Sequence, residues 1–84
     1  MQITFKLYAG LTEYLPVERR SGNQMTLEIA ADTPITGIIE PFHMPARLVK
    51  LVLVNGVFVP PEERATRTLV DGDVLAIWPP VAGG

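Results

Sequence analysis

The stretch that decides the fold is Asp71-Gly72-Asp73-Val74-Leu75-Ala76-Ile77-Trp78-Pro79-Pro80-Val81-Ala82-Gly83-Gly84. Its first three residues are typical of a turn, because glycine adopts positive φ without strain and aspartate bonds nearby backbone. The apolar, β-prone run 74–78 has the length of a strand. Proline lacks the backbone N–H that a sheet needs, so this strand must end before Pro79-Pro80. The stretch therefore predicts a domain over residues 1–78 that presents a flexible diglycine tail, residues 79–84.

The tail has the chemistry of an activatable acyl group. Six extended residues at ~3.3 Å each reach about 20 Å, enough to enter another protein's active site. Gly83 and Gly84 have no Cβ, so the backbone can pass through a narrow channel and the α-carboxylate is unshielded. A free carboxylate is ionised at neutral pH and is a poor acyl donor, so it requires activation. The alternative that the two glycines are incidental stays open.

The N-terminal third predicts two strands with a short helix between them. Residues 2–8 alternate, with Ile3, Phe5 and Leu7 on one face, which is typical of a half-buried strand. Leu11, Tyr14 and Leu15 share one helical face, and Pro16 closes that helix. Alternation resumes at residues 25–29, which predicts a second strand.

The middle of the chain predicts a helix and a hairpin. Thr33 is the expected N-cap, with Pro34 at the first helical position, and Ile35, Ile38 and Ile39 form one apolar stripe. Gly37 and Pro41 keep this helix short. Asn55-Gly56 favours a type I′ turn between strands at 50–54 and 57–59. We expect Leu69 to return to the core, and the element order suggests an α+β β-grasp fold with its first and last strands parallel at the centre of a mixed sheet.

The chain resembles the ubiquitin-like sulfur carriers of the MoaD/ThiS family. The resemblance is carried by the ending Trp78-Pro79-Pro80-Val81-Ala82-Gly83-Gly84, by the opening Phe5-Lys6-Leu7-Tyr8-Ala9-Gly10-Leu11-Thr12-Glu13-Tyr14-Leu15 and by Val54-Asn55-Gly56. It is strongest toward the small subunit of molybdopterin synthase. Residues 31–50 match the family poorly, which leaves the packing of 41–49 open.

Composition excludes several function classes. The sequence has 84 residues, no cysteine and a formal net charge of −2. It therefore offers no disulfide, thiolate metal site or catalytic thiol, and its interspersed charges do not indicate a nucleic-acid surface. No apolar run approaches the ~18 residues needed to span a bilayer, and the first residues lack the pattern of a signal peptide. We expect a cytoplasmic protein with no nucleic-acid or membrane partner.

Catalytic constellations are weak in this sequence. There is no Gly-rich phosphate loop, so another protein must bind the ATP for activation, and we expect no bound cofactor or metal. His43 is interpreted as an ordinary loop residue and Glu62-Glu63 as a solvated pair. Arg64 and Arg67 could recognise a carboxylate or phosphate, but a solvated surface is favoured.

The aromatic residues predict a docking surface beside the tail. If Leu75 and Ile77 face the core, Trp78 faces outward, and Tyr8 lies beside it when the first and last strands are neighbours. The family alignment adds Phe58 as a third apolar surface position. Exposed aromatics on so small a domain favour a contact site, with Pro79, Pro80, Val81 and Ala82 continuing it. The alternative is that Tyr8 or Trp78 only covers the core edge.

The resemblance implies a co-substrate and not an enzyme by itself. An E1-like adenylating enzyme would join AMP to the Gly84 carboxylate, and a sulfur donor would convert it to a thiocarboxylate. The tail would then enter the large molybdopterin synthase subunit, with Gly83 and Gly84 at the reacting end. Alternatives are a carrier for thiamine thiazole synthesis or another sulfur pathway, a ubiquitin-like modifier that forms isopeptides, and a plain binding module.

Overall fold

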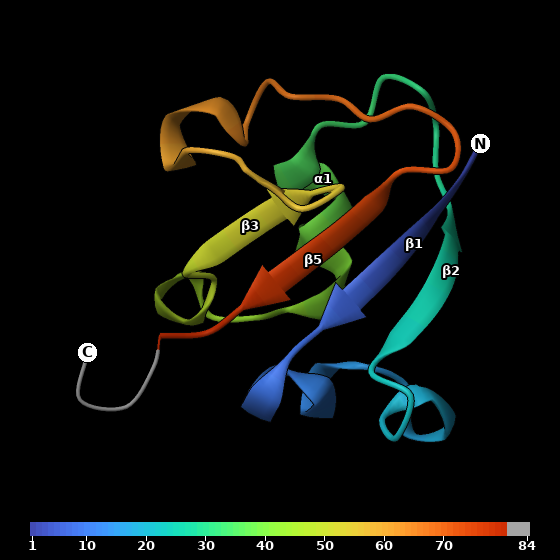
Figure 1. Ribbon diagram of the computed structural model, residues 1–84, viewed down its shortest axis with the longest axis vertical. Coiled ribbons are helices and arrows are strands. Elements are labelled where there is room, and N and C mark those ends of the chain that lie inside the picture. The colour runs from blue at the N-terminus through green and yellow to red at the C-terminus, as the bar shows by residue number, and fades with distance from the viewer. Residues whose placement is uncertain (81–84) are drawn as a thin grey trace.

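A five-stranded mixed sheet is the frame of the molecule, seen here in a computed structural model that describes residues 1–80. The strands run in the order β2-β1-β5-β3-β4 across the sheet. Their bounds are β1 Gln2–Leu7, β2 Gln24–Glu28, β3 Leu51–Val54, β4 Val57–Phe58 and β5 Val74–Trp78. Figure 1 shows β1 and β5 side by side in the middle, pointing the same way. The expected β-grasp arrangement is confirmed.

The register of the central strands fixes which side chains face the core. β1 pairs with β5 in parallel, with Phe5 opposite Leu75 and Leu7 opposite Ile77, and all four side chains are fully buried. β3 lies antiparallel on the other side of β5, with Val52 opposite Ile77. The alternation seen in the sequence therefore predicts the buried face correctly.

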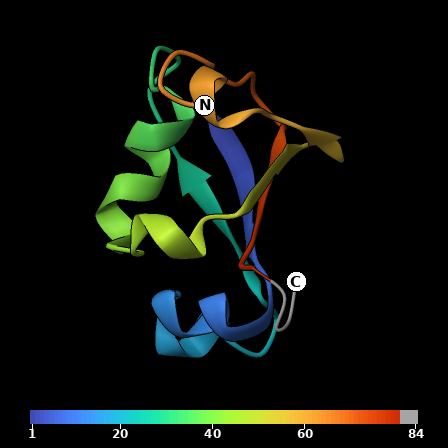
Figure 2. The ribbon, with the colours of Figure 1, turned by 90° about the vertical axis from the view of Figure 1, so that its left-hand side faces the viewer.

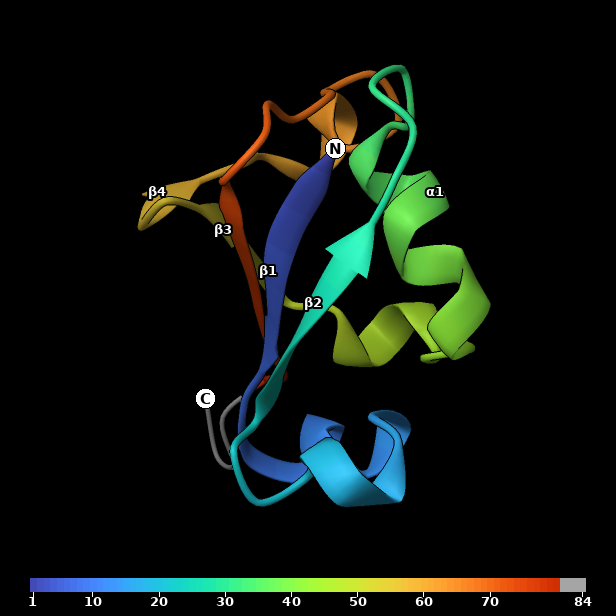
Figure 3. The ribbon, with the colours of Figure 1, turned by 90° about the vertical axis from the view of Figure 1, so that its right-hand side faces the viewer.

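One face of the sheet carries the helical segments (Figures 2 and 3). They are α1 Ile35–Ile39 and the 3₁₀ helices η1 Ala9–Tyr14, η2 Val17–Arg19, η3 Glu40–Phe42, η4 Ala46–Leu48 and η5 Pro61–Glu63. Ile35 and Ile38 of α1 are buried, and so are Leu11 and Leu15 around η1. The expected helix at 11–15 is thus a 3₁₀ helix that begins two residues earlier, and η2 follows directly after Pro16.

The start of α1 differs from the prediction by one residue. Pro34 takes the N-cap position with an extended ψ of 163°, and Thr33 makes no side-chain cap. The reason is tertiary: Pro34 forms an isolated β-bridge with Thr68, which requires extended backbone at Pro34. The helix therefore cannot include it.

Residues 41–49, whose packing the sequence left open, close the core from the side of α1. Phe42 stacks on Phe5 with ring centroids 4.5 Å apart. Met44, Leu48 and Val49 also pack against the core, and Leu69 is buried as expected. Among the described residues, none of the helices has the length and apolar character that crossing a bilayer requires.

Candidate functional site

The exit of the chain from β5 is fixed by backbone hydrogen bonds on both sides. The N–H of Tyr8 donates to the carbonyl of Ile77 at 3.1 Å, and the N–H of Lys50 donates to the carbonyl of Trp78 at 3.0 Å. Pro79 and Pro80 follow and cannot donate to the ladder. The last position held by the sheet is therefore Trp78, as the sequence predicts.

Tyr8 and Trp78 form a stacked aromatic pair at this exit. Their ring centroids are 4.0 Å apart and their planes differ by 5°. Trp78 remains 37% exposed, whereas Leu75 and Ile77 on the opposite face of the same strand are fully buried. The outward orientation of both aromatic rings is confirmed, and one face of the pair stays available to solvent.

The aromatic pair belongs to a larger apolar surface on the outer face of the sheet. Leu51 lies opposite Trp78, Leu53 opposite Ala76, and Phe58 opposite Leu53. Opposed residues of antiparallel strands point to the same face, so these side chains adjoin. Leu51 and Phe58 are exposed. We call this surface the exit patch, and it consists of Tyr8, Leu51, Leu53, Phe58, Ala76 and Trp78.

The exit patch covers only half of the outer face. On the side of β1 and β2 the outward positions are polar, with Thr4 opposite Thr26 and Lys6 opposite Gln24. Leu51 and Leu53 were missed in the sequence, because the continuous apolar run 50–54 has no alternation to say which residues face outward. The pairing with β5 supplies that information.

Arg64 is the clearest departure from the sequence-based expectation. The solvated interpretation is wrong, because Arg64 is 8% exposed. Its Nε donates to the Val59 carbonyl at 3.1 Å, and its Nη1 and Nη2 donate to the carbonyls of Val49 at 3.4 Å and Lys50 at 3.3 Å. Arg67 is exposed, as expected. Arg64 therefore joins η5 to both ends of the β3–β4 hairpin.

The positive charge of Arg64 is buried and lies near an aromatic ring. Burial lowers the pKa of the Arg64 guanidinium, and the nearby Glu62 carboxylate partly offsets this effect. The guanidinium stays protonated at neutral pH all the same. It also lies 5.9 Å from the ring centroid of Phe58, within the range of a cation–π contact. Phe58 thus connects the exit patch to Arg64.

The turn before β5 is stabilised by its two aspartates. The Asp71 carboxylate accepts from the N–H of Gln2 at 2.7 Å. Asp73 is nearly buried and accepts from the N–H of Val70 at 2.9 Å and from Nδ2 of Asn55 at 2.8 Å. Gly72 has a φ of +88°, a conformation that glycine adopts without strain, which explains why glycine occupies this position. This turn ties the start of β5 to β1 and to the hairpin turn.

The other candidate residues of the sequence do not come together. His43 is an exposed residue in the left-handed conformation at the end of η3, and Glu62-Glu63 is exposed on η5. Within residues 1–80 no group of three or more histidine and acidic side chains is arranged to hold a metal ion. Val81, Ala82, Gly83 and Gly84 lie outside the described residues, so their roles and the tail of residues 79–84 stay predictions.

The fold and the exit patch define a ubiquitin-like β-grasp protein. A family model described as Mut7-C ubiquitin matches residues 1–83. The chain belongs to this Mut7-C ubiquitin family. No curated protein matches the sequence.

Solved structures with the same fold come from archaea, bacteria and protozoa. SAMP1, small archaeal modifier protein 1, from Haloferax volcanii is 20% identical with a TM-score of 0.70, covering 100% of both chains. A complex of subunits 1 and 2 of molybdopterin-converting factor from Helicobacter pylori 26695 matches at 17% identity and a TM-score of 0.62, again over 100% of both chains. Urm1 from Trypanosoma brucei matches at 22% identity with a TM-score of 0.65, covering 99% of this chain and 95% of the Urm1 chain. The resemblance to ubiquitin-like carriers is thus confirmed at the level of the fold.

Proposed function

We propose that this chain is a sulfur carrier whose Gly84 carboxylate is adenylated by an E1-like enzyme and converted to a thiocarboxylate. The proposal requires a free α-carboxylate at Gly84. It makes the chain a co-substrate, with ATP bound by the activating enzyme. The cytoplasmic location stays a prediction.

The observation that carries the proposal is the anchoring of Trp78. The sheet holds the chain up to this residue through the bonds from Tyr8 and Lys50, and the stiff pair Pro79-Pro80 comes directly after it. A partner that grips the Trp78 ring thereby fixes where the following residues start. The depth that Gly84 reaches in a partner's active site would then be set by chain length alone.

The chemistry follows from the weakness of a carboxylate as an acyl donor. A carboxylate oxygen of Gly84 attacks the α-phosphorus of ATP, and pyrophosphate leaves. Hydrosulfide released by the donor then attacks the acyl carbon, and AMP leaves with the electron pair of the broken acyl–oxygen bond. The thiocarboxylate that results is a sulfur nucleophile at a terminus with no Cβ to shield it.

The exit patch is the proposed docking surface for the activating enzyme and for the large molybdopterin synthase subunit. A thin tail offers little area, and ordering it on a partner costs conformational entropy, so affinity must come mostly from the folded surface beside it. Tyr8, Phe58 and Trp78 suit that role, since exposed aromatics are enriched among interface hot spots. Pro79 and Pro80 extend the same surface.

The pathway we favour is molybdopterin synthesis, in which the tail enters the large molybdopterin synthase subunit and delivers sulfur to the pterin precursor. Two features support it: the fold likeness to a complex of molybdopterin-converting factor subunits and the double proline before the tail. Sulfur transfer for thiamine thiazole synthesis or another pathway is the alternative within the same chemistry. Reconstitution of sulfur transfer with each acceptor distinguishes these pathways.

Protein modification is a second candidate function. It is favoured by the fold likeness to small archaeal modifier protein 1 and uses the same activated Gly84, attacked by a lysine amine of a target instead of a sulfur nucleophile. Recovery of lysine-linked conjugates from cells would support it. A carrier restricted to sulfur transfer yields none.

Adenylation by the activating enzyme tests the proposal. We expect ATP-dependent release of pyrophosphate with the wild-type chain and none after deletion of Gly84 or substitution of Gly83 by tryptophan. Circular dichroism and thermal melting should be unchanged in both variants. Val17→Ala, which alters an exposed apolar residue of η2 outside the exit patch, serves as the control and should react as wild type. Normal adenylation of the Gly84 deletion would contradict the proposal.

A further inference from the structure

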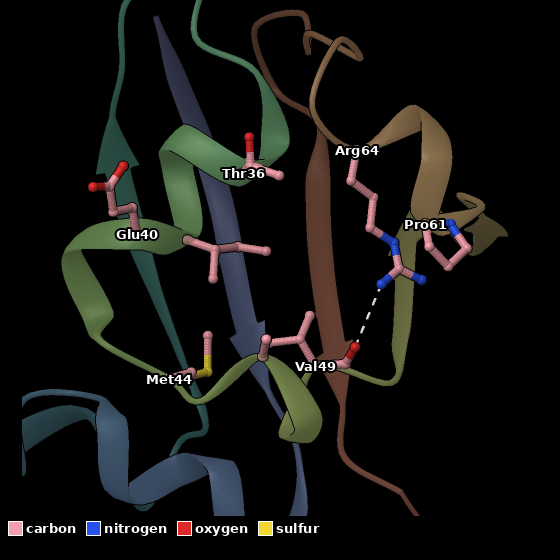
Figure 4. A pocket seen from close by; sticks show the side chains of 8 residues that line it. Thr36, Glu40, Met44, Val49, Pro61 and Arg64 are labelled. Atoms are coloured by element: carbon pink, nitrogen blue, oxygen red, sulfur yellow. Dashed lines mark hydrogen bonds between the residues drawn. The ribbon is translucent and has the colours of Figure 1, made fainter.

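A cavity lies between α1, η3 and η4 on one side and η5 on the other, and its lining includes no residue of the exit patch (Figure 4). Its volume is ≈ 280 Å³. The wall is largely apolar and includes Ile39, Met44, Ala46, Val49 and Pro61. Arg64 completes it, and Figure 4 shows its guanidinium directed toward the Val49 carbonyl. A small apolar cavity thus has one permanent cation in its wall.

The hydrogen-bonding capacity of that cation is not exhausted. A guanidinium has five N–H donors, and three of them serve the carbonyls of Val59, Val49 and Lys50. The two bonds made by the terminal nitrogens are long, at 3.3 and 3.4 Å. Terminal N–H groups of Arg64 therefore remain for a further acceptor.

The charge of Arg64 is offset only in part, by the nearby Glu62 carboxylate, and forms no ion pair among the described residues. Within residues 1–80 the one ion pair is between the N-terminus and Glu28, far from this cavity in the sequence. Arg64 is 8% exposed, and neutral carbonyls are its hydrogen-bond partners. Buried charges are ordinarily paired, so an unpaired one at a cavity wall indicates room for an anion.

We propose that this cavity binds a short aliphatic monocarboxylate, with its carboxylate on Arg64 and its alkyl chain against Ile39, Met44 and Val49. Hydrogen bonds between a guanidinium and a carboxylate are charge-assisted and can be bidentate, which suits the two terminal nitrogens of Arg64. The apolar wall accounts for the alkyl chain. The proposal does not rest on the proposed function, because its argument uses neither Gly84 nor an activating enzyme, although Phe58 of the exit patch contacts Arg64.

Size and charge restrict the ligand further. At ≈ 280 Å³ the cavity is slightly smaller than the range of about 300–1,000 Å³ for small-molecule sites, so only a short chain fits. Glu40 lies at the rim opposite Arg64, as Figure 4 shows. Its carboxylate is directed away from Arg64, but its negative charge on this side still favours a monoanion over a dicarboxylate.

Hexanoate is the probe for this site, compared with neutral hexanamide and with hexylammonium. Methyl and amide NMR spectra of the full chain are recorded during titration. We expect saturable shifts at Ile39, Met44 and Val49 with hexanoate, and binding weaker by about tenfold or more with hexanamide, since the charge-assisted bonds are lost. The Phe58 ring signals should shift as well, because the Arg64 guanidinium lies over that ring.

Two leucine variants separate the cavity from the rest of the surface. Ala46→Leu narrows the cavity while leaving the bonds of Arg64 intact, and it should abolish the hexanoate shifts. Ala65→Leu makes the same change at an exposed position next to Arg64 outside the cavity and should leave them unchanged. Absence of saturable hexanoate shifts in the wild type overturns the proposal. Equal responses to all three probes, or shifts that persist in Ala46→Leu, overturn it too.

Discussion

Replacing Trp78 by alanine tests the exit patch as a docking surface. Trp78 is 37% exposed, so roughly two-thirds of its surface is covered, and Tyr8 is one of the residues that it packs on. A fully buried aromatic side chain removes about 200 Å² from water, and two-thirds of this at ~25 cal/mol per Å² corresponds to about 3 kcal/mol. We therefore expect Trp78→Ala to lower the free energy of unfolding by about 2–3 kcal/mol.

This loss leaves a folded variant on which binding can be measured. A domain of this length has about 4–13 kcal/mol of stability, and the maximum of the stability curve lies near ~10–20 °C. Calorimetric titration at such a temperature with the proposed activating enzyme should show a loss of about 2 kcal/mol or more in binding free energy, a roughly 30-fold higher Kd. The large synthase subunit should respond in the same direction.

The control is an exposed apolar residue away from the exit patch. Val70 is 68% exposed and lies in the turn region before β5, at the opposite end of that strand from Trp78. Val70→Ala should bind both partners as the wild type does. An unchanged Kd for folded Trp78→Ala would refute the docking role of the exit patch, and the aromatic pair would then serve only the stability of the domain.

Three further predictions concern stability. Phe5 and Leu75 are fully buried, so Phe5→Ala and Leu75→Ala should each lower the free energy of unfolding by about 2–5 kcal/mol. A denaturant midpoint equal to that of the wild type in either variant would mean that these side chains do not face the core. Asp73→Ala should lower the free energy of unfolding by about 1–3 kcal/mol, because the N–H of Val70 and Nδ2 of Asn55 lose their acceptor. A melting temperature unchanged from the wild type would argue against these hydrogen bonds. Ala9 has a φ of 52°, which strains a residue with a Cβ, so Ala9→Gly should leave the free energy of unfolding unchanged or raise it by up to about 1 kcal/mol. A clear fall in the denaturant midpoint would contradict the strain at Ala9.

Local chemistry allowed much of the fold to be predicted. The two-residue alternation of β1 gave the correct buried face, because one slip would place Thr4 and Lys6 in the core. The run of β5 is apolar on both faces, so its facing was a condition that the pairing with β1 satisfies. Asn55 and Gly56 both have positive φ, as the expected type I′ turn requires. The termination of β5 before Pro79 follows from the missing N–H groups alone.

Residues whose environment depends on distant segments could not be predicted in the same way. Arg64 stands in a charged run, and the carbonyls that bury it come from residues 49, 50 and 59, which only the folded hairpin assembles. The stack of Phe42 on Phe5 likewise joins segments far apart in sequence. The one-residue shift at Pro34 arises from its bridge to Thr68.

The central claim concerns the chemical state of Gly84, and the intact mass of the protein purified from its own cells tests it most directly. The account predicts a population in which one oxygen is replaced by sulfur, with proteolysis after Arg67 assigning the change to the peptide 68–84. Cells blocked in activation should contain only the unmodified carboxylate. Finding only that carboxylate in cells active in sulfur transfer, or a peptide that continues beyond Gly84, would contradict the account.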